Sequence, residues 1–340
     1  MKIGNILFGK LGQQIVFDRN LPEAIRSNTN GNYEAYNILQ MLSKTLDNVF
    51  VAEDNILMSY EQQKMDDSIK LITDFVPKID YAFVLLGVSE QFMSQKLLNI
   101  INSGIKWYAL CSDPRCLDAL TKHITNPPIC VFAGAIGLEC EIGGKKFMTE
   151  YLNIEAANVY DEKILHQSKL IDCKHNKMIV VANQTNTWDR ISNVKEMTSL
   201  IPMEDVIIYG RCEEQLKDSR FGGEKTVQFI FNSQNLSKVT YVAPIAPGWI
   251  TAKYLECITR GVVPLLSKDY ATMVPEFVNA IKSVDTRLIV ETPREVLSMF
   301  HTITENDEYY IETIYKLRKA IYNVYSPVVL RDNMIKLIGG

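Results

Sequence analysis

The chain has 340 residues, of which 47% are hydrophobic and 22% are charged, and its formal net charge is −4. This length exceeds what one hydrophobic core usually supports, so two domains are expected. The acidic balance excludes a protein that grips nucleic acid through a generally basic surface, and no stretch approaches the ~20 apolar residues that a membrane-spanning helix needs.

Short apolar runs alternate with amphipathic stretches, a pattern typical of parallel sheets covered by helices on both faces. The predicted buried strands are Ile3–Phe8, Val49–Ala52, Tyr81–Leu86, Lys106–Leu110, Ile129–Phe132, Met178–Ala182, Val206–Tyr209, Val239–Val242, Val262–Leu266 and Arg287–Val290. The predicted helices include Tyr33–Asn48, Glu90–Ser103, Val194–Ile201, Arg294–Thr304, Asp307–Val324 and Leu330–Leu337. The sequence therefore predicts an α/β protein made of two doubly wound, Rossmann-like halves.

The two halves are expected to join in a polar, charged stretch. The residues Glu139–Lys146 predict a turn near the end of the first half, and the strand Met178–Ala182 lies near the start of the second. The predicted domains are residues 1–172 and 173–340. A last helix that packs back on the first domain is compatible with this division.

Two features near the N-terminus are candidates for a binding site. Gly9 and Gly12 follow the first predicted strand, where glycine lets a ligand approach the backbone closely or simply forms a turn. Glu34 lies in the first turn of the next predicted helix. A carboxylate there suits the helix dipole, and it could instead bind a hydroxyl of a sugar or of an acceptor.

Asp113 is the strongest catalytic candidate, because it comes directly after the buried strand Lys106–Leu110. The carboxyl ends of strands are where open α/β sheets bind ligands. Pro114 disfavours helical geometry at Asp113, and Arg115 would stabilise the ionised carboxylate. Asp113 could serve as a general base toward a hydroxyl group, or it could form a capped turn with a surface ion pair.

In the second half, a polar loop after the strand Met178–Ala182 leads to Arg190 at the start of a helix. An arginine at a helix start suits a diphosphate, although such a residue can also simply be solvated. Gly210 and Arg211 follow the next strand and are candidates to line a nucleobase pocket through their backbone.

The segment from Pro247 to Ser267 predicts a loop, a helix capped by Thr251, a left-handed glycine at Gly261 and a buried strand. Lys253 and Glu256 are three residues apart, so they share a face of this helix. A lysine near a helix N-terminus opposes the dipole, and a bound phosphate would resolve that conflict. Glu256 could then accept hydrogen bonds from a ribose diol. The alternative is a solvated Lys–Glu pair.

Other chemistry lacks support in the sequence. The four histidines are dispersed without metal-ligand spacing, so no metal site is predicted. Motifs for serine hydrolases, P-loop proteins and zinc peptidases are missing. Seven singly scattered cysteines and an N-terminus without an apolar leader favour a cytoplasmic protein.

The order of these motifs resembles the DNA β-glucosyltransferases of T-even bacteriophages, which have the GT-B fold. Tyr33-Glu34 falls where that family has a glutamate in its cleft, and Arg190 where it has a phosphate-binding arginine. The segment Tyr108–Arg115 resembles the family's Thr-Asp-Ile-Arg, whose aspartate is the catalytic base. Ile250–Glu256 resembles Ile-Thr-Leu-Arg-Val-Trp-Glu, in which arginine binds diphosphate and glutamate binds ribose.

The resemblance implies two Rossmann-like domains facing each other across a cleft, with the acceptor on the first domain and a UDP-sugar on the second. It implies an inverting transfer, with UDP-glucose as the favoured donor, to 5-hydroxymethylated cytosine in duplex phage DNA within the host cytoplasm. Asp113 would be the base; Glu34 and Arg115 would bind acceptor or sugar; Gly9, Arg190, Gly210, Arg211, Lys253 and Glu256 would bind UDP. Mg²⁺ or Mn²⁺ could assist without a dedicated protein cage.

The sequence also departs from that family. Lys253 replaces the arginine, the loop Asn183–Asp189 lacks its Gly-Gly and one arginine, and the stretch between Leu86 and Ile105 is shorter than its DNA-probing loop. Two alternatives therefore stay open: a GT-B enzyme that glycosylates a saccharide or small molecule, and a nucleotide-binding protein with a degenerate catalytic site.

Overall fold

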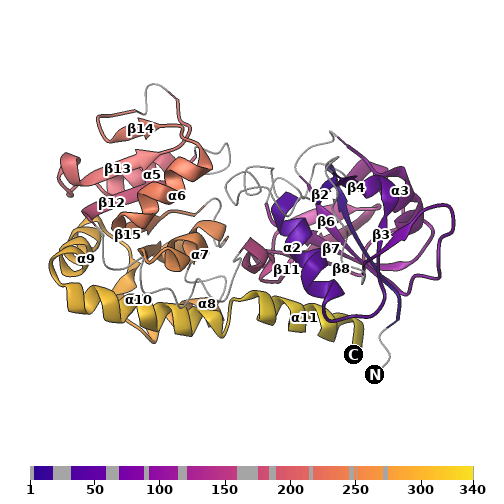
Figure 1. Ribbon diagram of the computed structural model, residues 1–340. Helices are drawn as coiled ribbons and strands as arrows, with labels where there is room; N and C mark the ends of the chain where they lie inside the picture. Colours follow the sequence, from indigo (N-terminus) through magenta and orange to yellow (C-terminus); the bar gives the residue numbers. More distant parts are fainter. Residues whose placement is uncertain are drawn as a thin grey trace. The chain divides into compact units, whose positions relative to one another are not determined.

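The computed structural model describes residues 4–17, 32–58, 69–87, 92–113, 121–158, 175–183, 189–213, 217–244, 249, 251–270 and 275–339. Contacts within the chain divide it into two compact units (Figure 1). The first unit comprises Met1–Asn158 together with Pro327–Gly340, and the second comprises Val159–Ser326. The predicted boundary between residues 172 and 173 lies outside the described residues.

The first unit is built on a seven-stranded sheet with the order β11-β8-β7-β6-β1-β3-β5. Every neighbouring pair in it is parallel. The strands are β1 (Ile6–Leu11), β3 (Val49–Ala52), β5 (Ile69–Ile72), β6 (Tyr81–Leu86), β7 (Lys106–Cys111), β8 (Cys130–Ala133) and β11 (Glu150–Tyr151). The chain moves outward in both directions from the pair β1–β6, which is therefore the switch point of a doubly wound sheet.

Helices and smaller strands complete the first unit. The helices are α2 (Asn32–Ser43), α3 (Gln95–Asn102) and α11 (Pro327–Gly339), with short 3-10 helices η1 (Glu53–Asn55), η2 (Thr121–His123) and η3 (Ile154–Asn158). The strand β2 (Ile15–Phe17) pairs with β4 (Ile56–Met58), and β9 (Glu139–Ile142) forms a hairpin with β10 (Lys145–Met148). The helix α11 belongs to this unit because it contacts α2 and η3, and because Tyr108 donates a hydrogen bond to the carbonyl of Leu337.

The second unit contains a six-stranded parallel sheet with the order β14-β13-β12-β15-β16-β17. Its strands are β12 (His175–Val181), β13 (Val206–Tyr209), β14 (Phe221–Gly223), β15 (Ser237–Val242), β16 (Val263–Ser267) and β17 (Ile289–Val290). Taken in chain order, this is the arrangement of a dinucleotide-binding Rossmann sheet, with its switch point between β12 and β15.

The helices of the second unit are α5 (Arg190–Met197), α6 (Val227–Asn235), α7 (Ala252–Thr259), α8 (Pro275–Lys282), α9 (Pro293–Glu305) and α10 (Asp307–Tyr322). Short 3-10 helices are η6 (Met203–Asp205), η8 (Lys268–Tyr270) and η9 (Thr286–Leu288). Local sequence explains several helix starts. At α9, for example, Thr292 and Glu295 form a capping box and Pro293 occupies the first turn.

The structure corrects several local predictions. The predicted turn Glu139–Lys146 is the β9–β10 hairpin, in which Gly143 and Gly144 supply the turn with φ values of +63° and +74°. The first strand continues to Leu11, so Gly9 lies inside a strand and not in a turn. The helix expected from Val194 begins at Arg190, because the Asp189 side chain caps it.

Candidate functional site

The switch point of the second sheet brings two helix starts to one edge. The helix α5 follows β12 and α7 follows β15, and these two strands are hydrogen-bonded neighbours. The helix α5 contacts α9, whereas the Arg260 guanidinium after α7 stacks 3.5 Å from the ring centre of Phe231 on α6. Because parallel strands end at the same edge, both helix starts lie at the carboxyl edge beside the switch point, where such sheets bind their ligands.

Lys253 and Glu256 form an ion pair on α7. The Lys253 Nζ lies 2.6 Å from the Glu256 Oε2, and their side chains are 33% and 16% exposed. The second carboxylate oxygen of Glu256 accepts no hydrogen bond from any described residue. The Lys–Glu pair named in the alternative thus exists, although it is part-buried and not fully solvated. Glu256 keeps acceptor capacity for a ligand because a carboxylate can accept about four hydrogen bonds.

The N-terminal end of α7 holds buried polar atoms without partners. Thr251 is the N-cap residue, as predicted, but its hydroxyl makes no capping hydrogen bond. Its Oγ1 and the Trp249 Nε1 are shielded from solvent and hydrogen-bonded to no described residue. Native proteins pair nearly all such atoms, and an exception calls for an explanation such as a ligand or a water. The end of α7 therefore has unsatisfied donors where the helix dipole favours an anion.

Tyr254 faces the other way. Its ring packs edge-on against Phe277 of α8, with ring centres 4.9 Å apart, and full burial raises its pKa well above the usual value. On a helix with 3.6 residues per turn, Tyr254 points away from Glu256. The contact with Phe277 therefore anchors α7 to α8 on the side of α7 opposite Glu256.

Arg190 occupies the first turn of α5 and is buried, with 5% of its surface exposed. The preceding Asp189 accepts a hydrogen bond from the Ser192 N–H at 3.1 Å. Tyr241 of β15 donates to the Asn193 Oδ1 at 2.8 Å, and burial raises the pKa of Tyr241 to about 12. Tyr241 thus ties the start of α5 to β15, so Arg190 and Lys253 approach the same sheet edge from helices that follow adjacent strands.

Gly210 and Arg211 follow β13. Gly210 has a φ of +148°, and a Cβ there would lie 1.8 Å from the Ala182 carbonyl oxygen, so only glycine fits. The Arg211 backbone N–H donates to the Asn183 side chain at 2.9 Å, while its exposed guanidinium pairs with Glu224 at 2.8 Å. The close packing of β12 and β13 fully explains the glycine; the nucleobase role stays a prediction.

The candidates in the first unit are less completely described. Asp113 follows the carboxyl end of β7, as predicted, is half-buried, and its carbonyl accepts a hydrogen bond from the Cys111 thiol at 3.0 Å. Glu34 lies in the first turn of α2, but its side chain is outside the described structure. Arg115 is outside the described residues altogether. Gly9 is closely packed, because a Cβ there would lie 2.6 Å from the Leu97 Cδ2 and would force that side chain to move.

Sequence reasoning missed two features of these sheet edges. Lys10 on β1 is only 1% exposed, and its ammonium donates to the Gln13 Oε1 at 2.9 Å. The first strand was predicted to end at Phe8, so a buried charge two residues later was not expected. The unsatisfied Trp249 and Thr251 were also missed, because a buried threonine before a helix is normally read as a cap.

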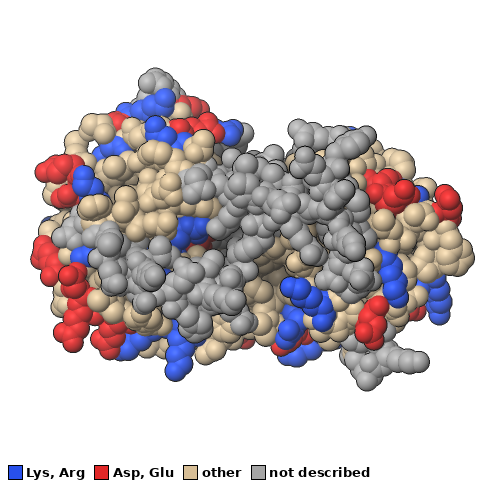
Figure 2. Space-filling view, in the orientation of Figure 1, with Lys and Arg blue, Asp and Glu red and all other residues tan. Residues whose placement is uncertain are grey.

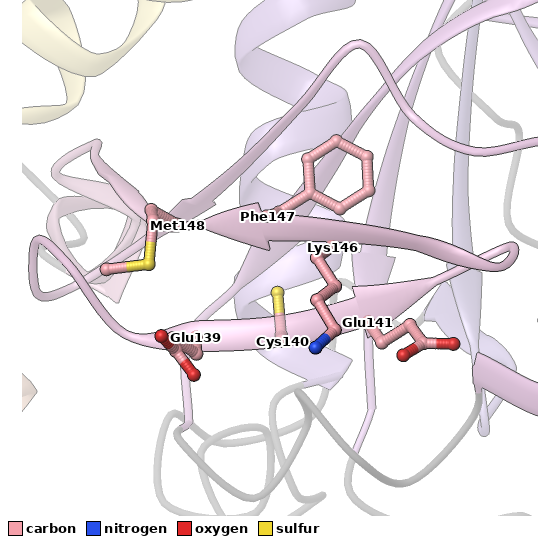
Figure 3. A pocket seen from close by; sticks show the side chains of 6 residues that line it. All are labelled: Glu139, Cys140, Glu141, Lys146, Phe147 and Met148. Atoms are coloured by element: carbon pink, nitrogen blue, oxygen red, sulfur yellow. The ribbon is translucent and has the colours of Figure 1, made fainter.

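Two hollows of the first unit lie elsewhere. One, of about 350 Å³, is on the β9–β10 hairpin, where the ammonium group of Lys146 and the sulfur of Cys140 extend to opposite sides (Figure 3). The other, of about 500 Å³, is lined by residues before β6 and β7, hence at the amino edge of the sheet. An amino edge is not where such sheets bind their ligands.

Charge and metal ligands set further limits. On the face shown in Figure 2, the described basic and acidic residues are interspersed. No cluster of three or more metal-ligating side chains occurs within the described ranges. In the same part of the chain, no helix combines the length and apolar character required to cross a membrane.

Comparison with solved structures identifies the fold. A glycosyltransferase from Rickettsia africae superposes with a TM-score of 0.53 at 12% identity, covering 98% of this chain and 97% of that one. Anabaena HepE, solved in complex with UDP, gives a TM-score of 0.51 at 10% identity over 99% and 100% of the two chains. No model of a protein family matches the sequence, and no curated protein sequence is detectably similar.

These likenesses and the two parallel sheets confirm the predicted fold class, the GT-B type with two doubly wound Rossmann-like domains. At such low identity they speak to the fold alone. Membership of the T-even DNA β-glucosyltransferase family stays a prediction, as do the roles of the individual site residues.

Proposed function

We propose that this protein is a glycosyltransferase that uses a UDP-sugar donor and a hydroxyl acceptor. The observation that carries the proposal is the N-terminal half of α7. There Lys253, Glu256 and the unpaired Thr251 hydroxyl adjoin the switch point of a Rossmann sheet. The UDP bound to the structurally similar HepE supports the same donor class here.

Each part of the donor has a partner of fitting chemistry in this proposal. The N–H groups at the start of α7, Lys253 and Arg190 would hold the diphosphate, because cationic groups and a helix N-terminus both favour anions. Glu256 would accept hydrogen bonds from the ribose hydroxyls, and Gly210 and Arg211 would border the base. A divalent ion, if used, would be held mainly by the diphosphate, since no described cluster of protein ligands could hold it.

For the chemical step we propose an inverting, single displacement. The acceptor oxygen attacks the anomeric carbon, its proton passes to the Asp113 carboxylate, and the bond between that carbon and the UDP oxygen breaks. Positive charge from Arg190 and Lys253 would stabilise the departing diphosphate. The half-buried position of Asp113 after β7 supports its assignment as base. Glu34 and Arg115 remain proposed contacts of the acceptor or sugar.

The resemblance noted in the sequence favours a hydroxymethylated cytosine in DNA as the acceptor, flipped out of the duplex, and glucose as the sugar. The net charge of −4 and the interspersed charges of Figure 2 favour the second candidate, a saccharide or another small hydroxyl compound. DNA binding would have to use a limited cationic patch, and would then show a shallow dependence on salt.

One experiment separates these acceptors. The protein is incubated with a panel of UDP-sugars and either hydroxymethylated DNA, unmodified DNA or a set of saccharides, and the DNA is digested to nucleosides for mass spectrometry. A sugar-bearing hydroxymethylcytidine supports the DNA acceptor. Glycosylated saccharide with unchanged nucleosides supports the second candidate. Failure to bind UDP by calorimetry would overturn the whole proposal.

A further inference from the structure

The C-terminal end of α7 is gripped by two side chains of α10. Arg318 donates from Nε to the Ile258 carbonyl and from Nη2 to the Thr259 carbonyl, both at 3.0 Å. Tyr310, about two turns earlier on α10, donates its hydroxyl proton to the Gly261 carbonyl at 2.6 Å. Both side chains are buried, with exposures of 3% and 1%. We call Arg318 and Tyr310 the α10 clamp.

The clamp completes the hydrogen bonding of this helix end. A helix leaves its last four carbonyls without partners in the helical ladder. In α7 the Ile258 and Thr259 carbonyls are satisfied by Arg318, and the Glu256 carbonyl accepts from the Arg260 Nη1 at 3.1 Å. The Cys257 carbonyl accepts from the Val262 N–H at 2.9 Å, as the chain turns through Gly261 with a φ of +72° into β16.

Arginine is suited to this position for electrostatic and geometric reasons. Burial lowers the pKa of Arg318, because desolvation disfavours the charged form of its guanidinium. The negative end of a helix dipole is a favourable place for a cation, and a planar guanidinium can serve two adjacent carbonyls at once. A lysine would keep the charge but could not reproduce both hydrogen bonds.

The two ends of α7 are therefore anchored differently. At the N-terminal end, the Thr251 hydroxyl provides no cap, so this end lacks a side-chain hydrogen bond that would fix it. At the C-terminal end, the clamp fixes the helix against α10 and the start of β16. Because α7 has only eight residues, its Lys253 and Glu256 lie within two turns of the carbonyls that the clamp holds.

We propose that Arg318 and Tyr310 are positioning residues for the donor, which set the depth and rotation of α7 and thereby align Lys253 and Glu256 with UDP. The inference rests on the proposed function of α7 in donor binding. It assigns to two residues outside the crevice a share of the donor affinity.

Neighbouring tyrosines on α10 provide a matched test. Tyr310→Phe removes the hydrogen bond to Gly261. Tyr309→Phe removes a comparable one, from the Tyr309 hydroxyl to the Asp285 Oδ2 at 2.7 Å, which does not touch α7. UDP affinity is measured by calorimetry, and thermal stability by circular dichroism, for both variants, for Arg318→Lys and for Glu256→Ala.

We expect similar small losses of stability in the two tyrosine variants, but weaker UDP binding only in Tyr310→Phe, by about threefold to tenfold, as for one net hydrogen bond. Arg318→Lys, assayed well below its melting temperature, should weaken UDP binding at least as much as Tyr310→Phe, because lysine cannot reproduce both hydrogen bonds to α7. Normal UDP affinity in Tyr310→Phe and Arg318→Lys, together with weak binding in Glu256→Ala, would overturn the clamp proposal alone. Normal affinity in Glu256→Ala would instead overturn the donor site itself.

Discussion

The Lys253 Nζ lies 2.6 Å from the Glu256 Oε2, so the cation assigned to the diphosphate and the acid assigned to the ribose are bound to each other. When UDP binds, Lys253 and Glu256 would each have to make hydrogen bonds both to one another and to the nucleotide. The two residues should therefore not act independently, and the effects of their substitutions on UDP affinity should not add.

Replacing Glu256 tests the ribose contact. Glu256→Ala should weaken UDP binding by about 1.5–3 kcal/mol, the range for lost hydrogen bonds to a charged group. Thermal stability should change little, because a Lys–Glu pair on a helix contributes only about 0.2–0.5 kcal/mol. Glu312→Ala on α10, which breaks the exposed pair with Lys316 at 2.7 Å, is the control and should leave UDP affinity intact. Loss of stability without loss of affinity would mean that the pair is purely structural.

Replacing Thr251 tests the unpaired hydroxyl. Thr251→Val keeps the shape of the side chain and removes an atom that satisfies no described partner. Stability should therefore stay equal or rise, while UDP binding should weaken by about 1–2 kcal/mol if the hydroxyl meets the diphosphate. Calorimetry with UDP and thermal melts provide the two measurements.

Thr198→Val is the matched control for that prediction. The buried Thr198 hydroxyl donates to the Val194 carbonyl at 2.8 Å and accepts from the Arg220 Nη1 at 2.9 Å. Its loss should destabilise the protein by about 1–3 kcal/mol, because Arg220 is left with an unsatisfied donor. Equal destabilisation by both valine variants would show that Thr251 has a structural partner.

Replacing Asp113 tests the proposed base. Asp113→Asn preserves the size of the side chain but removes its ability to accept a proton. A positioned base typically contributes about 10²–10⁴-fold, so kcat should fall by that factor. UDP affinity should be unchanged, since Asp113 belongs to the first unit and α7 to the second. Near-normal turnover would shift the assignment to Glu34, which is the next acid to replace.

Acid should weaken the second unit through Asp285. Burial alone would raise the pKa of this carboxyl, but hydrogen bonds from Arg287 and Tyr309 hold it at about 2. A folded-state pKa below the unfolded value near 3.9 gives stability that is present above about pH 4 and is lost as pH falls toward 2. The unfolding free energy of Asp285→Asn, measured by denaturant titration at several pH values, should fall less steeply over this interval. The difference in slope should correspond to about one proton fewer taken up on unfolding. An unchanged slope would contradict the assignment.

Much of the architecture could be predicted from apolar runs, because strands buried on both faces are continuous in sequence. Val49–Ala52, Tyr81–Leu86 and Val206–Tyr209 have the predicted bounds. The edge strands β5 and β14 were not predicted, because neither has a continuous run of apolar residues. The helices α6 and α8 were not among the predicted helices, although α3 and α7, which are equally short, were.

The candidate site divides in a similar way. Pattern and spacing could locate Lys253, Glu256 and the left-handed Gly261, because each follows from helix geometry. Nothing local could reveal that Arg318, some 60 residues from Ile258 in the chain, caps the same helix. Nor could a pattern show that Thr251 is buried without a partner, since that depends on what surrounds it in three dimensions.

The discontinuity of the first unit has a consequence for biosynthesis. The hydrogen bond from Tyr108 to Leu337 joins positions 229 residues apart, and the apolar face of α11 formed by Leu330, Met334 and Ile338 is buried. Domains usually fold in turn as the chain leaves the ribosome, at about 5–20 residues per second. Here the unit that emerges first cannot cover its core until α11 has emerged. The first unit can therefore be completed only after the whole second unit has been synthesised, and residues 1–158 expressed alone should be prone to aggregate.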